Sequence, residues 1–297
     1  MTEFSGRIID GYKIGALVGK GSIGTVYSAS DSNGGSFAVK IMELNPFLDA
    51  SALDAIIEGA IASSKVSECA RIVKVYKAAK TKDFYYVVME FMQGGTLERL
   101  IGENGLPVEN KIKIGLLLAE TIACIHSKGI IHGDLKPGNI MLDSHDTPYL
   151  TDFYYSTLNL KRGIGLFPQG TPRYMSPEQA MGQFITTSSD IYSFGVLYYE
   201  LLTGAVPYKE SSSNIAGMIT TVLKSEIVHP SGYNRKLDRK LCAILLKMLQ
   251  KKIEDRYQNM QQVVSDLKGY LEGAGSGESV EKSIFQQIKG LFTQKKR

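Results

Sequence analysis

The sequence predicts an α+β protein with two unequal lobes, a small antiparallel β-sheet lobe with one helix followed by a larger, mainly α-helical lobe. Two patterns carry this prediction. Short β-type runs broken by glycines fill the chain up to Phe91, and helical periodicity takes over after Gly94 and Gly95. A chain of 297 residues with 43% hydrophobic content can also bury a substantial core. The predicted lobes cover residues 1–92 and 93–272.

Five short β-type runs predict the sheet of the first lobe. One helical pattern interrupts them: after a cap at Asp49 or Ser51, apolar residues recur on one helical face from Leu53 to Ile61. The predicted strands are Tyr12–Val18, Thr25–Ala29, Ser36–Met42, Ile72–Ala78 and Phe84–Phe91.

Helical periodicity and loops rich in Gly and Pro predict the second lobe. The predicted helices lie around Val108–Ser127, Ser188–Thr203, Leu237–Gln250 and Met260–Leu271.

The end of the chain differs in composition from the two lobes. Residues 273–279 form a Gly/Ser-rich flexible linker, and residues 280–297 carry apolar side chains on one helical face together with several lysines. This pattern predicts a basic amphipathic tail helix. Three destinations stay open for it: docking on the body of the protein or on a partner, peripheral contact with an anionic membrane, or a frayed end.

Charge and hydropathy narrow the class of protein. With 34 basic and 30 acidic side chains the net charge is only +4, so we expect no nucleic-acid partner. The first residues, up to Gly11, lack the apolar core of a secretory signal. The longest apolar stretch, residues 112–125, is interrupted by Lys113 and Glu120 and is too short to cross a bilayer. We therefore expect a cytoplasmic protein.

The three cysteines, Cys69, Cys124 and Cys242, are far apart in sequence and odd in number. They show no Cys-x-x-Cys spacing that would indicate a metal or redox pair. We expect all three to be reduced, buried thiols.

Residues 19–26, with the sequence GKGSIGTV, fit the pattern G-x-G-x-x-G-x-V. Taken alone, this pattern is weak evidence for a nucleotide site, because several nucleotide-binding folds and many tight turns share it. The residues after Gly24 favour a second strand and not a helix, which argues against a dinucleotide fingerprint, and the spacing misses the G-x-x-x-x-G-K-[ST] phosphate loop. Two interpretations remain: a strand-turn-strand flap whose backbone amides approach phosphate oxygens, or an ordinary flexible hairpin.

Five motifs in fixed order resemble those of the eukaryotic-like (Hanks-type) serine/threonine protein kinases, over residues 12–271. They are the glycine loop, FAVK at 37–40, HGDLKPGN at 132–139, DF at 152–153 and SPE at 176–178. The resemblance implies the bilobal protein kinase fold, ATP and Mg²⁺ as cofactors, and serine or threonine residues of proteins as substrates. The form MSPEQ at 175–179 resembles bacterial members.

The resemblance also implies roles for single residues. Asp134 would orient the substrate hydroxyl and accept its proton, and Lys136 would offset the charge of the transferring phosphate. Lys40 lies in an apolar strand, where its ammonium needs a carboxylate and phosphate oxygens, and Glu58 on the predicted helix is the implied partner.

The implied magnesium ligands are Asn139 and Asp152. Three support residues follow from the same resemblance. Glu178 and Arg256 would form a buried ion pair, and Asp190 would anchor the backbone of the catalytic loop. His132 is expected to be a packed structural residue and not a base.

Residues 87–92 predict a strand that leads into a hinge between the lobes, where backbone groups of Glu90 and Met92 would bond adenine and Met89 would limit the back of the site. The complete implied nucleotide set is Gly19, Gly21, Ser22, Gly24, Val26, Ala38, Lys40, Met89, Glu90, Met92 and Met141.

Two positions depart from the family pattern. Gly133 stands where the family usually has an Arg that binds a phosphate on the activation segment, and residues 158–170 contain no Ser, Thr or Tyr. We therefore predict activity that does not depend on phosphorylation of the centre of that segment. Tyr154 replaces the usual Gly after Phe153, which should restrict the backbone there in a direction that the sequence leaves open.

The alternative to an enzyme is a pseudokinase scaffold that binds nucleotide or partners without turnover. The loss of Lys40, Asp134, Asn139 or Asp152 would indicate such a scaffold. All four are present, so the sequence favours a serine/threonine protein kinase.

Overall fold

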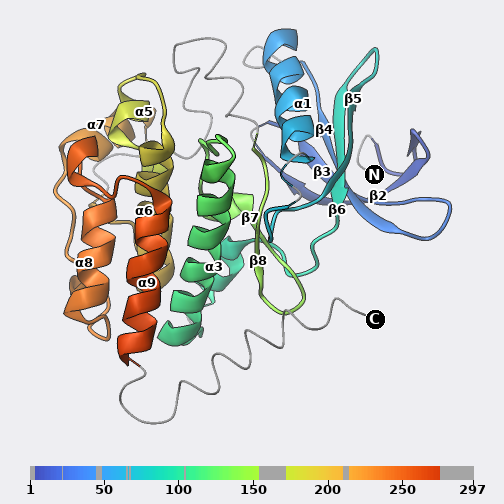
Figure 1. Ribbon diagram of the computed structural model, residues 1–297. Coiled ribbons are helices and arrows are strands. Elements are labelled where there is room, and N and C mark those ends of the chain that lie inside the picture. Colours follow the sequence, from blue (N-terminus) through green and yellow to red (C-terminus); the bar gives the residue numbers. More distant parts are fainter. Residues whose placement is uncertain are drawn as a thin grey trace.

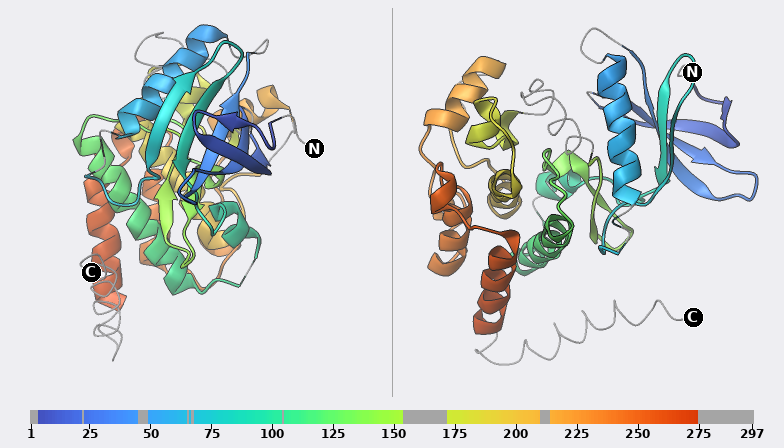
Figure 2. Two further views of the ribbon diagram at one scale, coloured as in Figure 1. Left: turned by 90° about the vertical axis from the view of Figure 1, so that its right-hand side faces the viewer. Right: turned by 45° about the horizontal axis from the view of Figure 1, so that its top comes forward.

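Two lobes of different composition make up the protein (Figure 1). The right-hand view of Figure 2 separates the sheet and its helix from the helical lobe. The predicted fold class is confirmed. The computed structural model describes residues 4–21, 23–44, 49–64, 66, 68–103, 105–153, 172–209 and 214–274.

The first lobe is built on a six-stranded sheet in which every neighbouring pair of strands is antiparallel, in the order β1-β2-β3-β4-β6-β5. The sequence pattern missed the short first strand, which pairs its two residues with the start of β2. The strands are β1 (Ile8–Ile9), β2 (Tyr12–Lys20), β3 (Thr25–Ser30), β4 (Ser36–Met42), β5 (Val75–Lys80) and β6 (Tyr85–Glu90).

Helix α1 (Ala50–Ser64) covers one side of the sheet, next to β5 and β6. Asp49 is its cap, because the Asp49 Oδ1 atom accepts a hydrogen bond of 2.7 Å from the Ala52 amide. Leu53 and Ile56 are buried in the core of the lobe, whereas Ile61 is 46% exposed. The predicted helix is therefore confirmed, and of the two predicted caps, Asp49 and Ser51, the structure selects Asp49. The buried face of the helix is narrower than the sequence pattern suggested.

The connection from α1 to β5 ties the two lobes together. We predicted a strand from Ile72, but β5 begins at Val75. Ile72 instead forms a parallel bridge with Leu150 of the second lobe, and the Val73 amide donates to the Leu150 carbonyl at 2.8 Å. These residues satisfy their backbone groups across the lobes, so they cannot also extend the ladder of β5.

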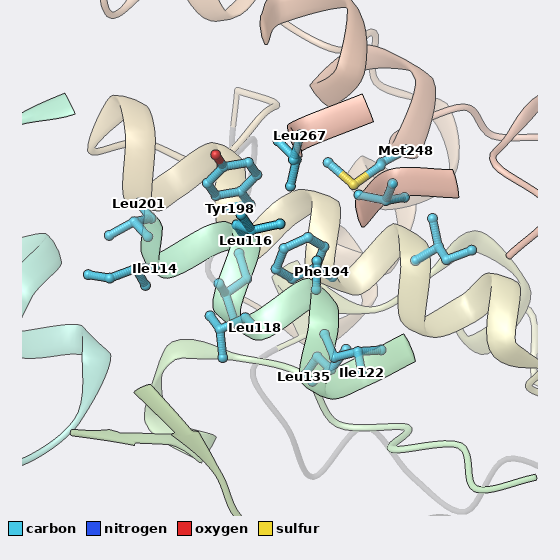
Figure 3. Close-up of a cluster of buried hydrophobic side chains, with 14 of the residues drawn as sticks. Ile114, Leu116, Leu118, Ile122, Leu135, Phe194, Tyr198, Leu201, Met248 and Leu267 are labelled. Carbon is cyan, nitrogen blue, oxygen red and sulfur yellow. The ribbon is translucent and has the colours of Figure 1, made fainter. Parts of the chain in front are cut away.

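The second lobe is organised around helices α3 (Val108–Ser127) and α6 (Thr187–Thr203), whose apolar side chains interdigitate (Figure 3). Gly115 lets the two helices approach closely, since a Cβ there would lie 2.2 Å from the Tyr198 ring. The other elements are α2 (Leu97–Gly102), β7 (Ile140–Leu142), β8 (Pro148–Leu150), α5 (Pro177–Ala180), α7 (Ile215–Lys224), α8 (Arg239–Met248) and α9 (Met260–Ala274).

The expectation of three reduced cysteines is wrong for two of them. Cys69, which follows α1, is joined to Cys124 on α3 by a disulfide bond of 2.01 Å, with their Cα atoms 5.8 Å apart. Cys242 is a free, buried thiol. The two bonded cysteines are 55 residues apart in sequence, so their proximity depends on how the α1–β5 connection packs on α3.

Several predictions lie outside the described residues: those for Ser22, Tyr154, residues 158–170 and the tail 280–297. Helix α9 runs through Ala274, into the first two residues of the predicted linker. Within the described part of the chain, no helix combines the length and the apolar character needed to span a membrane.

Candidate active site

A cavity of about 620 Å³ lies between the lobes, and we call it the interlobe cavity. Its walls come from the β2–β3 hairpin, β4, the segment after β6, the 132–139 loop and the segment after β8. Such a volume suits a nucleotide-sized ligand. The predicted site residues that line it are Gly19, Gly21, Gly24, Val26, Ala38, Lys40, Met89, Glu90, Met92, Asp134, Lys136, Asn139, Met141 and Asp152.

The glycine-rich segment connects two antiparallel strands, β2 and β3, as the sequence predicted. The Gly21 amide donates to the Gly24 carbonyl at 2.8 Å and closes the turn. At Gly24 a Cβ would lie 2.4 Å from the Ile41 carbonyl oxygen on β4, so a side chain does not fit. At Gly19 a Cβ would meet nothing within 4 Å, which leaves the backbone open to an approaching ligand.

Asp190 holds the 132–139 loop in place from the first turn of α6. Its carboxylate accepts hydrogen bonds from the His132 amide at 2.7 Å and the Gly133 amide at 2.8 Å, and it lies 2.8 Å from His126 Nε2 on α3. Asp190 is 1% exposed, and these partners compensate for burying its charge. The predicted anchoring role of Asp190 is confirmed.

Asp134 is oriented by two side chains of its own loop. The Asn139 amide Nδ2 donates to Asp134 Oδ2 at 2.7 Å and to its backbone carbonyl at 2.8 Å, and Lys136 Nζ lies 2.7 Å from the same Oδ2. Because Nδ2 of Asn139 faces Asp134, its Oδ1 atom is the group that can accept or ligate at the cavity.

Lys40 meets a carboxylate, but not the one that we expected. Its Nζ atom lies 2.8 Å from Asp152 Oδ2, and its side chain is only 7% exposed. Glu58 is exposed on α1, and no Lys40–Glu58 ion pair forms between these two described residues. The sequence could not show this difference, because the position of α1 relative to β4 depends on tertiary packing.

Asp152 also has a positive φ of 63°, a conformation that costs a non-glycine residue about 1 kcal/mol or more.

The donor set fits Mg²⁺ bound jointly with phosphate. Asn139 and Asp152 both face the interlobe cavity, and magnesium in nucleotide sites usually takes one or two protein oxygens, with phosphate and water completing its shell. Among the residues that the structure describes, no group of three or more His, Cys, Asp or Glu side chains is placed to hold a metal ion.

His132 is a buried structural residue, as predicted. Burial lowers the pKa of its imidazole below the usual 6.5, although Asp190 opposes this effect. Its Nδ1 atom accepts from the Asp134 amide at 3.2 Å, and Nε2 lies 3.0 Å from the Thr151 carbonyl. A neutral ring with its proton on Nε2 satisfies both contacts. His132 therefore links the backbone at Asp134 to the segment that leads to Asp152.

A buried ion pair supports the same face of the second lobe. Arg256 donates from Nη1 and Nη2 to the two carboxylate oxygens of Glu178, each at 2.8 Å, and Ser189 donates to Glu178 at 2.7 Å. Burial raises the pKa of Glu178, but the hydrogen bonds and charge of Arg256 outweigh burial and lower the pKa overall. The predicted pair is confirmed.

Sequence reasoning missed some of the lining residues. Val18 directly precedes the glycine pattern and could have been found from strand alternation alone. Val73 and Glu98 line the cavity because segments far apart in the chain pack together, and no local sequence pattern reveals such contacts. The residues missed are Val18, Lys20, Ile23, Val73, Phe91, Thr96, Glu98, Gly138 and Thr151.

Comparison with known proteins agrees with this geometry. Residues 12–267 match the model of the protein kinase domain. The chain is 31% identical to the serine/threonine-protein kinase PrkC of Bacillus subtilis over 88% of this chain and 41% of that protein. It is 30% identical to PknB of Lactococcus lactis, described as a probable serine/threonine-protein kinase, over 97% of this chain and 46% of that protein. The chain thus spans less than half the length of these bacterial relatives.

Proposed function

We propose that this chain, which belongs to the protein kinase family and is of the serine/threonine type, transfers the γ-phosphate of ATP to serine or threonine hydroxyls of proteins. One observation carries the proposal. The carboxylate, amide and ammonium groups that phosphoryl transfer needs, on Lys40, Asp134, Lys136, Asn139 and Asp152, all line the interlobe cavity.

Asp134 acts as the base of the reaction. Its carboxylate orients the substrate hydroxyl and takes up the hydroxyl proton, while the oxygen bonds to the γ-phosphorus and ADP leaves. The hydrogen bond from Asn139 fixes the carboxylate before any substrate arrives. Lys136, now 2.7 Å from Asp134, is close enough to exchange this contact for the transferring phosphate.

Asn139 and Asp152 would hold magnesium, which neutralises charge on the phosphate oxygens when bound. Lys40, whose ammonium now pairs with Asp152, would bind phosphate oxygens of ATP next to the metal. An inward movement of α1 would let the Glu58 carboxylate pair with the Lys40 ammonium. For adenine, the Glu90 amide already donates to the Lys74 carbonyl at 2.9 Å, so a bond from this residue would use its carbonyl group.

Gly133 supports activity without phosphorylation at the centre of the activation segment. It lacks a side chain that could bind phosphate, and its backbone has a φ of 77°, which glycine adopts without strain. Its amide and carbonyl are bonded to Asp190 and Gln179. Phosphatase treatment of the purified protein should therefore leave kcat unchanged, and a large fall in kcat would contradict this part of the proposal.

Replacing Asp134 tests the reaction itself. Asp134→Asn keeps the size of the side chain but removes the base, so kcat on a generic protein substrate should fall by about 10²- to 10⁴-fold. Binding of ATP, measured by calorimetry, is the control and should change little. The alternative, a scaffold without turnover, predicts equal phosphate incorporation by the wild type and the variant.

A further inference from the structure

The disulfide between Cys69 and Cys124 joins the α1–β5 connection covalently to α3 of the second lobe, where Cys69 packs in the hydrophobic core. Cys69 is 4% exposed, and Cys124, near the end of α3, is partly exposed. A cross-link between segments 55 residues apart restricts how the first lobe can move on the second.

Two ion pairs flank the disulfide. Lys128 Nζ lies 2.7 Å from Glu68, with side chains that are 46% and 76% exposed. Arg71 Nη2 lies 3.1 Å from Glu120, whose side chain is 29% exposed. The exposed Lys128–Glu68 pair contributes little. Arg71 is only 14% exposed and also donates to Thr121 Oγ1 at 3.3 Å, so it adds a partly buried contact, and the disulfide adds a covalent one.

The connection continues directly into the wall of the interlobe cavity. The Leu150 amide donates to the Arg71 carbonyl at 2.9 Å, and the Val73 amide donates to the Leu150 carbonyl at 2.8 Å. Val73 lines the cavity, and Asp152 follows Leu150 by two residues. A displacement of the α1–β5 connection on α3 would therefore shift one wall of the cavity and the segment that carries Asp152.

We propose that Cys69 and Cys124 form a reversible thiol–disulfide modification site, and that its oxidised form increases the affinity of the interlobe cavity for nucleotide. In the oxidised form the cavity wall keeps one position. In the reduced form the wall adopts several positions, and only one of them binds nucleotide well. The apparent Kd rises in inverse proportion to the fraction of molecules in the binding position.

The chemistry balances with a dithiol as reductant and a peroxide as oxidant. A dithiol thiolate attacks the more exposed sulfur, on Cys124, and the sulfur–sulfur bond breaks to release the Cys69 thiolate, which takes up a proton. The second dithiol sulfur then displaces Cys124 and leaves the dithiol oxidised. In the reverse direction, peroxide converts one thiolate to a sulfenic acid, and condensation with the other thiol forms the disulfide and releases water.

Cys242 provides the matched control. Cys242 is buried in α8, outside the segments that carry Cys69 and Cys124. Burial raises the pKa of its thiol, and this lowers the reactivity of the thiol. Cys242→Ala should leave the redox response intact, whereas Cys124→Ser should abolish it.

The test uses the full chain, oxidised with hydrogen peroxide or reduced with dithiothreitol. Alkylation of the native protein followed by mass spectrometry counts the free thiols, and calorimetry with ATP and Mg²⁺ gives the Kd. We expect Cys69 and Cys124 to be protected only in the oxidised protein, and the Kd to rise by about threefold or more on reduction, as for a competent fraction of one third. Re-oxidation should restore the lower Kd.

Two results would overturn the proposal. Alkylation of both cysteines after peroxide treatment would show that the bond does not form, and equal Kd values in the two states would show that it does not act on the cavity. Both readouts are independent of catalysis. A protein that binds ATP in a redox-dependent way but phosphorylates nothing would refute the proposed transfer reaction and leave this inference standing.

Discussion

The 132–139 loop and helix α1 carry the two acidic residues of the predicted catalytic set, and the surroundings of these two residues differ. Around Asp134 the loop is held by buried groups from α6 and by its own Asn139. Glu58 on α1, by contrast, is exposed, and its predicted partner Lys40 pairs with Asp152.

This difference indicates that the second lobe is a prearranged platform, whereas the first lobe completes the site by its position. The platform rests on buried, mutually satisfied polar groups, which adopt one arrangement because any other would leave a charge unpaired. Helix α1 packs within its own lobe, and the α1–β5 connection ties it to the second lobe. The predictions that follow test the two halves of this comparison.

Breaking the buried ion pair should have the largest effect on stability. Arg256→Met leaves the Glu178 carboxylate buried without its bidentate partner, so the free energy of unfolding should fall by about 3–5 kcal/mol, as measured by urea denaturation.

The double variant Arg256→Met with Glu178→Leu removes both charges and should recover part of this loss. Recovery should be incomplete, because the Arg256 guanidinium also donates to the carbonyls of Gln250, Ser188 and Lys251. A single variant as stable as the wild type would show that the platform does not depend on this pair.

Gly115→Ala tests the close packing of α3 on α6. The new methyl group would overlap the buried Tyr198 ring, so we expect a loss of about 1–3 kcal/mol in the free energy of unfolding. Gly269→Ala on α9 is the matched control, since nothing lies within 4 Å of the added carbon. It should stabilise the helix by about 0.5–1 kcal/mol. Equal effects of the two variants would contradict the packing argument.

His132 should make stability depend on pH. Because burial lowers its pKa in the folded state, the unfolded chain takes up the proton first. The contribution is therefore fully present above the unfolded value of 6.5 and is lost as the pH falls below it. The loss should approach about 1.4 kcal/mol per pH unit relative to His132→Gln, which removes the titrating group. Parallel stability curves for the two proteins between pH 7.5 and 5 would rule this out.

Glu58→Gln should have the smallest effect on stability, below about 0.5 kcal/mol, because the side chain is exposed. Its kcat/KM should nevertheless fall by about tenfold, the effect of losing one charged hydrogen bond, if Glu58 pairs with Lys40 during catalysis. Asp54→Asn on the same helix is the control for charge and should change kcat/KM little. Unchanged kcat/KM in the Glu58 variant would remove that residue from the catalytic set.

Much of this architecture could be predicted from the sequence. The bounds of α3, the strand-turn-strand glycine segment, the Asp49 cap and the Glu178–Arg256 pair all followed from periodicity, capping rules or motif order. These features depend on neighbouring residues or on a family pattern that spans the chain. Short elements such as β1 and α2 were missed, because few residues carry their pattern.

What the sequence determined by itself is the set of chemical groups: an intact Asp134, Lys136 and Asn139, with Gly133 in place of a phosphate-binding Arg. Tertiary structure alone decided which of these groups meet. It paired Lys40 with Asp152 and bonded Cys69 to Cys124. The physical reason is that local patterns report the environment of each segment, whereas contacts between distant segments depend on how the whole core packs.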